Sequence, residues 1–277
     1  MKKIRRYPTA LTIAGSDSGG CAGIHLKTFS SLGVFVASVI TAITAQNTAE
    51  VRAVEVLSTE IIKKQLEAVL DDMTVDVIKT GMLPSIEIIE LVASIIDRYN
   101  LPSVIVDPVM VATSGARLAS TSIVSAFNNY LYPRITLITP NLPEAEALSG
   151  IKIHSEKDIY TAAEILLSQG CPAVLIKGGH SQSPDSTDIL FTANTEPVRF
   201  SSARINSCNL HGTGCTYSSA IAAYISLDYN IEDAIRLAKN YISSAIKAGQ
   251  NITTGKGYGP VNHFLEPQSL KIKRYDD

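Results

Sequence analysis

The sequence predicts an α/β protein in which a mostly parallel sheet lies between helices. Several short segments rich in β-branched residues are apolar nearly throughout, which is typical of strands covered on both faces. The longer segments between them place apolar residues at helical spacing, with charged residues opposite. Because connections between parallel strands are right-handed, this alternation places helices on both faces of the sheet.

The individual elements follow from the same periodicities. The expected strands span residues 9–15, 36–47, 75–81, 103–109, 134–140 and 172–179. The expected helices span residues 58–73, 85–100, 156–170 and 217–226, and Ser58 and Ser155 are N-cap candidates. Polar alternation over residues 185–205 predicts an antiparallel hairpin at an edge of the sheet. Since no linker, repeat or low-complexity tract interrupts the chain, we expect one domain over residues 1–277.

Composition excludes several classes of protein. The chain has 277 residues, 45% hydrophobic and 18% charged, with a formal net charge of -2. This balance is typical of an ordinary soluble globular protein and gives no sign of a nucleic-acid or membrane partner. The N-terminus "MKKIRRYPTALTIAGSDSGG" places basic residues before an apolar run, but that run is too short for a signal peptide. We therefore expect a first strand there and a cytoplasmic protein.

The four cysteines show no metal-binding or disulfide pattern. Cys21, Cys171, Cys208 and Cys215 form no C-x-x-C pair and have no zinc-type spacing with histidine. In a reducing compartment no disulfide is expected among them. Cys215 is notable only for its setting, which is a run of glycine and threonine before a helix.

Ligands of parallel α/β sheets bind beyond the carboxyl ends of the strands, so the residues after each strand are candidates. The loop "AGSDSGGCAG" could let a ligand approach the backbone or could be a tight turn, and it matches neither the dinucleotide nor the P-loop spacing. Gln46 and Asn47 follow the second strand. Their amides can read the edge of a heteroaromatic ring or can form a polar turn.

Charged residues follow three later strands. Asp107 comes directly after a strand, and Asn141 and Glu144 lie at a strand-to-helix junction. These oxygens could hold Mg²⁺ through water, or could cap a helix. Lys177 adds a cation at the same edge, unless it is a lysine that extends from a strand end into solvent.

The stretch "NLHGTGCT" predicts an anion pocket. Gly212 and Gly214 let backbone N–H groups converge, and the helix that follows adds partial positive charge. Such a pocket stabilises a phosphoryl group during transfer. Together with the charged residues, it indicates phosphoryl transfer without a Walker loop.

The ordered motifs "VITAITAQNT", "KTGML", "DPVMVATSG", "TPNLPEAEAL", "VLIKGGH", "NLHGTGCT" and "GKGYGPVNHF" resemble the hydroxymethylpyrimidine/phosphomethylpyrimidine kinases of thiamine biosynthesis, within the ribokinase superfamily. The resemblance covers nearly the whole chain. It implies a ribokinase-like three-layer α/β/α sandwich and a homodimer. It also implies ATP-dependent phosphorylation of 4-amino-5-hydroxymethyl-2-methylpyrimidine and then of its monophosphate.

The resemblance also implies roles for individual residues. Gln46 would read the pyrimidine, with Gly15, Met82 and Val109 as pocket neighbours. Asp107 and Glu144 would hold Mg²⁺, and Asn141 and Lys177 would bind the nucleotide. Gly212 and Gly214 would form the anion hole, and Cys215 stands where sugar kinases of the superfamily carry an aspartate base. The helix terminus favours a Cys215 thiolate and a neighbouring triphosphate disfavours it, so its role as base is a hypothesis.

One departure from the family pattern bears on the substrate. The family reads approximately "AGIQADLKTFSALG", whereas this chain reads "AGIHLKTFSSLG" and lacks the aspartate expected near the pyrimidine. His25 could replace a contact there, or could be a helix-surface residue. A pyridoxine or pyridoxal kinase and a non-catalytic pyrimidine-binding protein remain alternatives.

Overall fold

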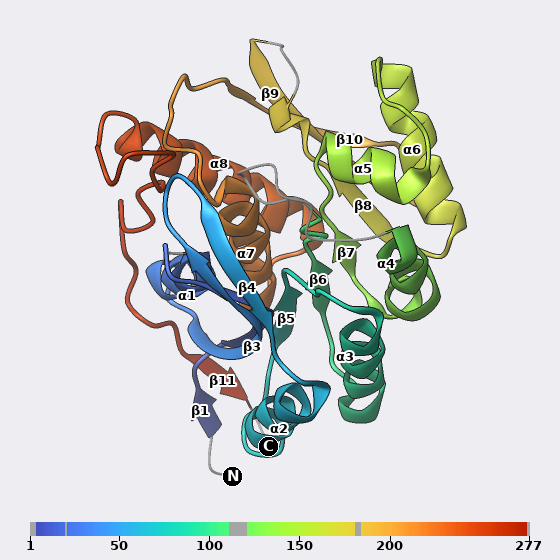
Figure 1. Ribbon diagram of the computed structural model, residues 1–277, viewed down its shortest axis with the longest axis vertical. Coiled ribbons are helices and arrows are strands. Elements are labelled where there is room, and N and C mark those ends of the chain that lie inside the picture. The colour runs from blue at the N-terminus through green and yellow to red at the C-terminus, as the bar shows by residue number, and fades with distance from the viewer. Residues whose placement is uncertain (1–3, 20, 111–120, 181–183, 276–277) are drawn as a thin grey trace.

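A nine-stranded sheet forms the middle of the molecule (Figure 1). The computed structural model describes residues 4–19, 21–110, 121–180 and 184–275. The strands of the sheet are β2 (Thr9–Asp17), β3 (Phe35–Gln46), β4 (Val51–Val56), β5 (Val77–Thr80), β6 (Val104–Val106), β7 (Leu137–Ile138), β8 (Ala173–Ile176), β9 (Asp185–Thr192) and β10 (Val198–Ala203). Their order is β10-β9-β8-β7-β6-β5-β2-β3-β4.

The strands predicted from the sequence form the parallel centre of this sheet. β3, β2, β5, β6, β7 and β8 are parallel neighbours. β4 pairs antiparallel with β3, β9 with β8, and β10 with β9. The predicted edge hairpin is confirmed as β9 and β10. β4 was not predicted, because its side chains are mostly exposed and its pattern lacks the apolar run of a buried strand.

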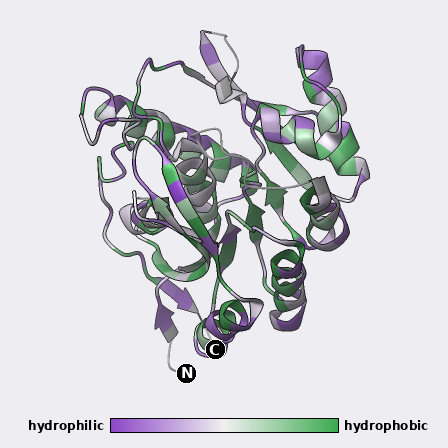
Figure 2. Cartoon of the chain, viewed as in Figure 1, coloured by the Kyte–Doolittle hydropathy of each residue, from purple (hydrophilic) through white to green (hydrophobic). Residues whose placement is uncertain are grey.

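Helices cover both faces of the sheet, which confirms the three-layer sandwich. They are α1 (Cys21–Ser31), α2 (Thr59–Leu70), α3 (Ile86–Tyr99), α4 (Thr121–Ala126), α5 (Leu142–Ser149), α6 (Glu156–Ser168), α7 (Thr213–Ser226) and α8 (Ile231–Gly249), with short π and 3₁₀ turns η1 (Phe127–Leu131), η2 (Tyr132–Arg134) and η3 (Gly178–His180). α2 to α6 lie on one face, and α1, α7 and α8 lie on the other. Apolar residues are concentrated in the central strands (Figure 2).

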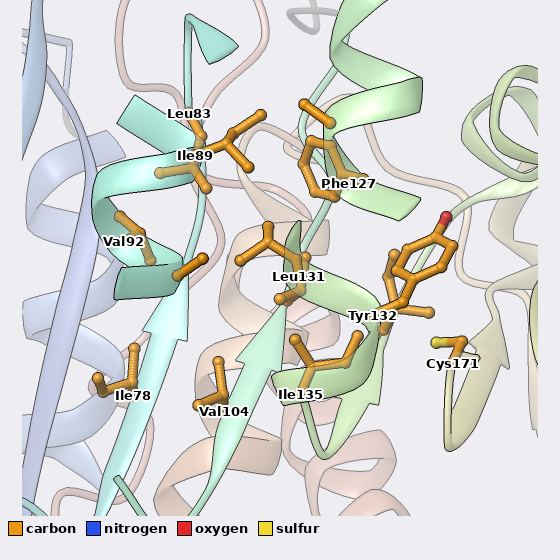
Figure 3. Packing of buried hydrophobic residues seen from close by; sticks show 14 of the residues in the cluster. Ile78, Leu83, Ile89, Val92, Val104, Phe127, Leu131, Tyr132, Ile135 and Cys171 are labelled. Atoms are coloured by element: carbon orange, nitrogen blue, oxygen red, sulfur yellow. The ribbon is translucent and has the colours of Figure 1, made fainter. Parts of the chain in front are cut away.

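Each layer of helices has its own hydrophobic core against the sheet. In the first, Val92 and Leu131 lie over Ile78 and Val104 of the strands (Figure 3). In the second, α7 and α8 are rich in alanine, so they approach the strands and each other closely. The two cores hold the strands rigidly, so the residues that follow the strands are held in fixed positions.

Side-chain caps begin the helices where the sequence predicts them. Ser58 accepts a hydrogen bond from the Ile61 N–H, and Ser155 accepts one from the Asp158 N–H. Asn141 begins α5 with a reciprocal capping box to Glu144. The cap fixes the entry of α5 directly after β7.

A second, two-stranded sheet joins the two ends of the described chain. It pairs β1 (Ile4–Arg6) with β11 (Lys273–Tyr275) in antiparallel fashion. Asp76 stabilises the pair, because its carboxylate lies 2.6 Å from Arg6 Nη2 and 3.3 Å from Lys273 Nζ. Among the described residues, no helix is both long and apolar enough to cross a bilayer.

Candidate active site

A cavity of about 680 Å³ opens at the carboxyl-terminal edge of the parallel strands. This is the edge at which ligands bind in sheets of this class. Its walls come from the ends of β2 and β3, from the residues that follow the next parallel strands, and from the start of α7. The lining includes the site residues named from the sequence: Gly15, Gln46, Met82, Asp107, Val109, Asn141, Glu144, Lys177, Gly212, Gly214 and Cys215.

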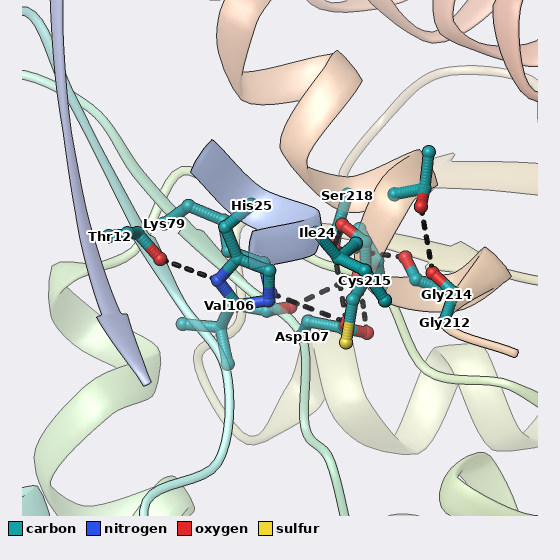
Figure 4. Close-up of polar contacts among 12 residues, drawn as sticks. Thr12, Ile24, His25, Lys79, Val106, Asp107, Gly212, Gly214, Cys215 and Ser218 are labelled. Atoms are coloured by element: carbon teal, nitrogen blue, oxygen red, sulfur yellow. Dashed lines mark hydrogen bonds and ion pairs between the residues drawn. The ribbon is translucent and has the colours of Figure 1, made fainter. Parts of the chain in front are cut away.

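Asp107 lies at the centre of a buried charge cluster (Figure 4). Its Oδ1 accepts a hydrogen bond of 2.8 Å from Lys177 Nζ, and its Oδ2 accepts one of 3.0 Å from Ser218 Oγ. Lys79 Nζ lies 3.6 Å from Oδ2. Burial disfavours the carboxylate, but the charges of Lys177 and Lys79 outweigh it and hold the pKa of Asp107 well below its usual range. Asp107 therefore stays ionised, with both oxygens engaged by the protein.

Lys177 connects this cluster to the start of α7. Its N–H donates to the carbonyl of Pro140, which fixes the end of β8 beside the residue that begins α5. Its Nζ lies 3.4 Å from the point where a Cβ on Gly214 would stand. Burial opposes the charge of Lys177, but Asp107 and Glu144 together outweigh it and raise its pKa. A permanent cation thus stands beside the first turn of α7.

Asn141 and Glu144 form the capping box and also face the cavity. Glu144 Oε2 accepts from the Asn141 N–H at 2.8 Å, and Asn141 Oδ1 accepts from the Glu144 N–H at 2.9 Å. Burial raises the pKa of Glu144 to about 7, and the Asp107 charge adds to this while Lys177 opposes it. A nearby cation would stabilise the ionised form of such a buried carboxyl group. The capping alternative is confirmed, and the chemistry of this carboxyl also fits a cation ligand.

The start of α7 has the backbone of an anion site. Gly212 is the N-cap with φ +73°, and a Cβ there would overlap Ile24 of α1, so the position requires glycine. Because the N-cap residue is glycine, its side chain cannot accept a hydrogen bond from the first turn of α7. The first N–H groups of a helix also lack acceptors within the helix. Cys215 lies in this first turn, is half-buried and lines the cavity. The helix N-terminus, Gly214 and the Lys177 ammonium together suit a phosphate group.

The other end of the cavity has an amide and apolar neighbours. Gln46 ends β3, and its Oε1 lies 3.4 Å from Thr44 Oγ1. A Cβ on Gly15 would stand 3.4 Å from Met82 Sδ, so glycine there leaves the methionine room beside the cavity. An amide beside a thioether suits a flat heterocycle with polar edges.

Asn47 has a different task from Gln46. Its Oδ1 accepts from the N–H groups of Ala49 and Glu50, at 2.8 and 3.0 Å, and so closes the turn between β3 and β4. Of the two amides, Asn47 therefore forms the polar turn, whereas Gln46 lines the cavity.

Several lining residues were not predicted from the sequence. Asp17 faces His211, with 3.3 Å between Oδ2 and Nε2. Tyr258 reaches the cavity from near the C-terminus, where its N–H donates to the Thr48 carbonyl at 3.0 Å. His211 and Tyr258 stand inside motifs that carry the resemblance, but only the fold shows that they reach the cavity.

A buried ion pair forms the far wall, next to the edge hairpin. Lys239 Nζ of α8 lies 2.7 Å from Asp188 Oδ2 of β9, and Asp188 Oδ1 accepts from the Gly178 N–H at 2.9 Å. The apolar side chains of Ile242 and Ile246 continue this wall. Asp188 had no signal in the sequence, because it lies within the polar alternation of a hairpin.

His25 is buried, so its interpretation as a helix-surface residue is wrong. Only 3% of the residue is exposed, and it lines the cavity from α1. The ring faces the neighbouring strands β2 and β5, where it contacts Thr12 and Lys79. Helical periodicity alone could not show this, because the partners come from distant strands.

Comparison with known proteins identifies the family. The sequence profile of phosphomethylpyrimidine kinase matches residues 17–262. The chain belongs to the phosphomethylpyrimidine kinase family. It is 44% identical over 267 residues to a hydroxymethylpyrimidine/phosphomethylpyrimidine kinase of Escherichia coli, covering 95% of this chain and 98% of that protein. It is 45% identical over 269 residues to that of Bacillus subtilis, covering 96% and 98%.

Some relatives in this kinase family are longer. The thiamine biosynthesis bifunctional protein ThiED of Geobacter sulfurreducens is 46% identical over 273 residues, which is 96% of this chain and 55% of that protein. The chain thus spans about half the length of this bifunctional relative. It spans nearly all of the two kinases named above.

Solved structures of related kinases share the fold. The phosphomethylpyrimidine kinase of Clostridium difficile is 45% identical, with a TM-score of 0.75 over 86% of this chain and 99% of that one. The pyridoxal kinase of Bacillus subtilis, in an ADP complex, is 34% identical, with a TM-score of 0.85 over 93% and 98%. Sequence identity is higher to the pyrimidine kinase, while the backbone superposes well on both.

Proposed function

We propose that this chain uses ATP to phosphorylate 4-amino-5-hydroxymethyl-2-methylpyrimidine and then its monophosphate. One observation carries the proposal: a single cavity joins Gln46 at one end to Lys177 and the start of α7 at the other. The first end suits a polar heterocycle and the second suits phosphate groups. Membership of the phosphomethylpyrimidine kinase family supports the same substrate class.

The geometry supports direct transfer of the phosphoryl group. In the first phosphorylation the hydroxymethyl oxygen attacks the γ-phosphorus of ATP, and in the second a phosphate oxygen of the monophosphate does. Each time the bond from the γ-phosphorus to the bridging oxygen breaks as ADP leaves. Lys177 and the first-turn N–H groups of α7 stabilise the charge that spreads over the transferred group. No covalent intermediate with the protein is needed.

The hydroxyl proton needs an acceptor, and we propose the Cys215 thiolate. Asp107 is a poor base, because its carboxylate is held ionised by two lysines and both of its oxygens are engaged. Cys215 lines the cavity at the helix N-terminus, where a thiolate is stabilised.

Glu144 and Asp107 are the residues that would hold Mg²⁺. The raised pKa of Glu144 shows a buried carboxyl that a cation would stabilise, and Asp107 supplies a second negative charge nearby. Because Asp107 is already engaged by lysines, we propose that it acts through water. When bound, the ion would neutralise charge on the phosphates of ATP.

A turnover assay tests the proposal against both alternatives. Purified protein with Mg-ATP is offered the hydroxymethylpyrimidine, its monophosphate or pyridoxal, and ADP formation is measured. We expect a higher kcat/KM for the two pyrimidines than for pyridoxal. A preference for pyridoxal would favour the second candidate, which the TM-score of 0.85 to a pyridoxal kinase supports. Tight pyrimidine binding without ADP formation would indicate a binding protein.

We also propose a homodimer and a cytoplasmic location. The ribbon of β3 and β4 at one edge of the sheet exposes Ile43, Val54 and Val56, and a second copy of the chain would cover them. The reduced thiols of Cys171 and Cys208 support a reducing compartment. Sedimentation at several concentrations tests the dimer, and Val54→Glu should shift it toward monomer.

A further inference from the structure

His25 departs from the sequence pattern of the family, and its buried side chain has polar contacts with Thr12, Lys79 and Cys215. Its Nδ1 lies 2.6 Å from Thr12 Oγ1 of β2, and its Nε2 lies 3.2 Å from Lys79 Nζ of β5 (Figure 4). Lys79 has no exposed surface and lies 3.6 Å from Asp107. A line of side chains therefore runs from Thr12 through the ring to the charge cluster.

Donor and acceptor chemistry decides which ring nitrogen carries the proton. An ammonium group only donates, so Nε2 of His25 must accept from Lys79. The neutral ring then carries its proton on Nδ1 and donates it to Thr12. Burial, and after it the charge of Lys79, lower the pKa of His25 below 6.5, although Cys215 and Asp107 oppose the shift. The ring is therefore neutral and has one defined tautomer.

Lys79 needs such a partner to hold its position. A lysine ammonium ends a flexible chain, and its distance of 3.6 Å to Asp107 is longer than a direct hydrogen bond. Gly81 leaves room for the contact, since a Cβ there would stand 3.1 Å from His25 Cε1 and 3.3 Å from Lys79 Nζ. The His25 ring thus limits where the ammonium can lie.

We propose that His25 is a positioning residue, whose Nδ1–H imidazole holds the Lys79 ammonium beside Asp107. Asp107 in turn holds Lys177 at the start of α7. This inference rests on the proposed function, because Lys177 matters there as the group that faces the transferred phosphoryl group. His25 also hydrogen-bonds to Cys215, so its variants are measured in a Cys215→Ala background as well, where the contact with Lys79 remains and that with Cys215 is removed.

Matched variants of His25 separate the hydrogen bond to Lys79 from the packing contribution of the ring. His25→Gln can place an amide oxygen near the Nε2 position and accept from Lys79, whereas His25→Asn reaches only the Nδ1 position. We expect His25→Leu and His25→Asn to lower kcat roughly 10- to 100-fold with little change in the KM for the pyrimidine. His25→Gln should restore kcat to within about threefold of the native value. His154→Gln, at an exposed histidine, is the control and should change nothing.

Equal loss of kcat in the Gln and Asn variants would overturn the proposal, and so would a loss that appears only in KM. If the variants do not fold, the native protein still provides a test. In ¹⁵N NMR spectra the two ring nitrogens of His25 should report the Nδ1–H tautomer at neutral pH. Lys79→Met should shift the Nε2 resonance, because that nitrogen loses its donor. A ring protonated on Nε2, or on both nitrogens, would contradict the inference.

The NMR result does not depend on turnover. If the native chain phosphorylates no pyrimidine, the proposed function fails, while the tautomer can still be as expected. If it turns over normally and His25→Leu has native kcat, the positioning role fails and the function stands.

Discussion

Lys177 donates a hydrogen bond of 2.8 Å to Asp107, and both side chains are buried. Asp107→Asn would leave Lys177 and Lys79 as buried ammonium groups without their carboxylate. We expect the free energy of unfolding to fall by about 3–5 kcal/mol and kcat to fall with it. Urea denaturation and initial rates measure the two effects. Lys64→Met, which breaks an exposed pair with Glu60, should change stability by less than about 0.5 kcal/mol.

Gln46 should control recognition of the heterocycle. Its replacement by Ala leaves ring polar groups without their partner, which costs about 1–3 kcal/mol. The KM for the pyrimidine should then rise roughly 5- to 150-fold while the KM for ATP stays unchanged. Asn47→Ala is the matched control, because Asn47 closes a turn and should alter stability alone. Unchanged pyrimidine kinetics in the Gln46 variant would remove this residue from the substrate site.

Cys215 should affect the chemical step if its thiolate accepts the proton. Loss of a general base costs about 10²- to 10⁴-fold in rate, so Cys215→Ala should lower kcat within that range and leave ATP binding intact. Cys208→Ala, at an exposed thiol, should keep native rates. Full turnover by the Cys215 variant would contradict the base role and leave the backbone N–H groups as the part of this motif that acts in catalysis.

The two glycines before Cys215 should differ in their tolerance of a side chain. Gly212→Ala requires an alanine at φ +73° and an overlap with Ile24, so it should destabilise the fold by about 1–3 kcal/mol. Gly214→Ala meets only Lys177 Nζ at 3.4 Å and should fold normally. Its effect should appear instead as a higher KM for ATP. Equal melting temperatures for the two variants would contradict this distinction.

Acid should destabilise the protein through His263. Burial, with a contribution from the charge of Lys27, lowers the pKa of His263 to about 4. The unfolded state therefore binds more protons than the folded state between about pH 6.5 and pH 4, so stability falls as the pH falls through that window. His263→Gln should flatten this part of the curve of unfolding free energy against pH. His154→Gln should leave the curve unchanged. Because the lowered pKa of His25 leaves a residual slope, a slope in the His263 variant as steep as in the native protein would exclude His263 as a source.

The sequence predicts those parts of the structure that depend on local pattern. The buried strands are apolar on both faces and the capped helices are amphipathic, so their periodicity marks them. The residues after the strands could be named because parallel strands bring their ends together. Lys79 and His25 could not be assigned, because their roles arise from contacts across 54 positions of the chain. Asp188 and Lys239 meet across 51 positions, also without a local signal.

The pairing of β1 with β11 has a consequence for how this kinase can be joined to other proteins. β1 leads into the start of β2, while the cavity lies at the far end of that strand, about 25–30 Å away by the rise per residue. No described residue of β1 or β11 lines the cavity. A fused partner at either end would therefore leave the entrance open, which is compatible with relatives of twice this length.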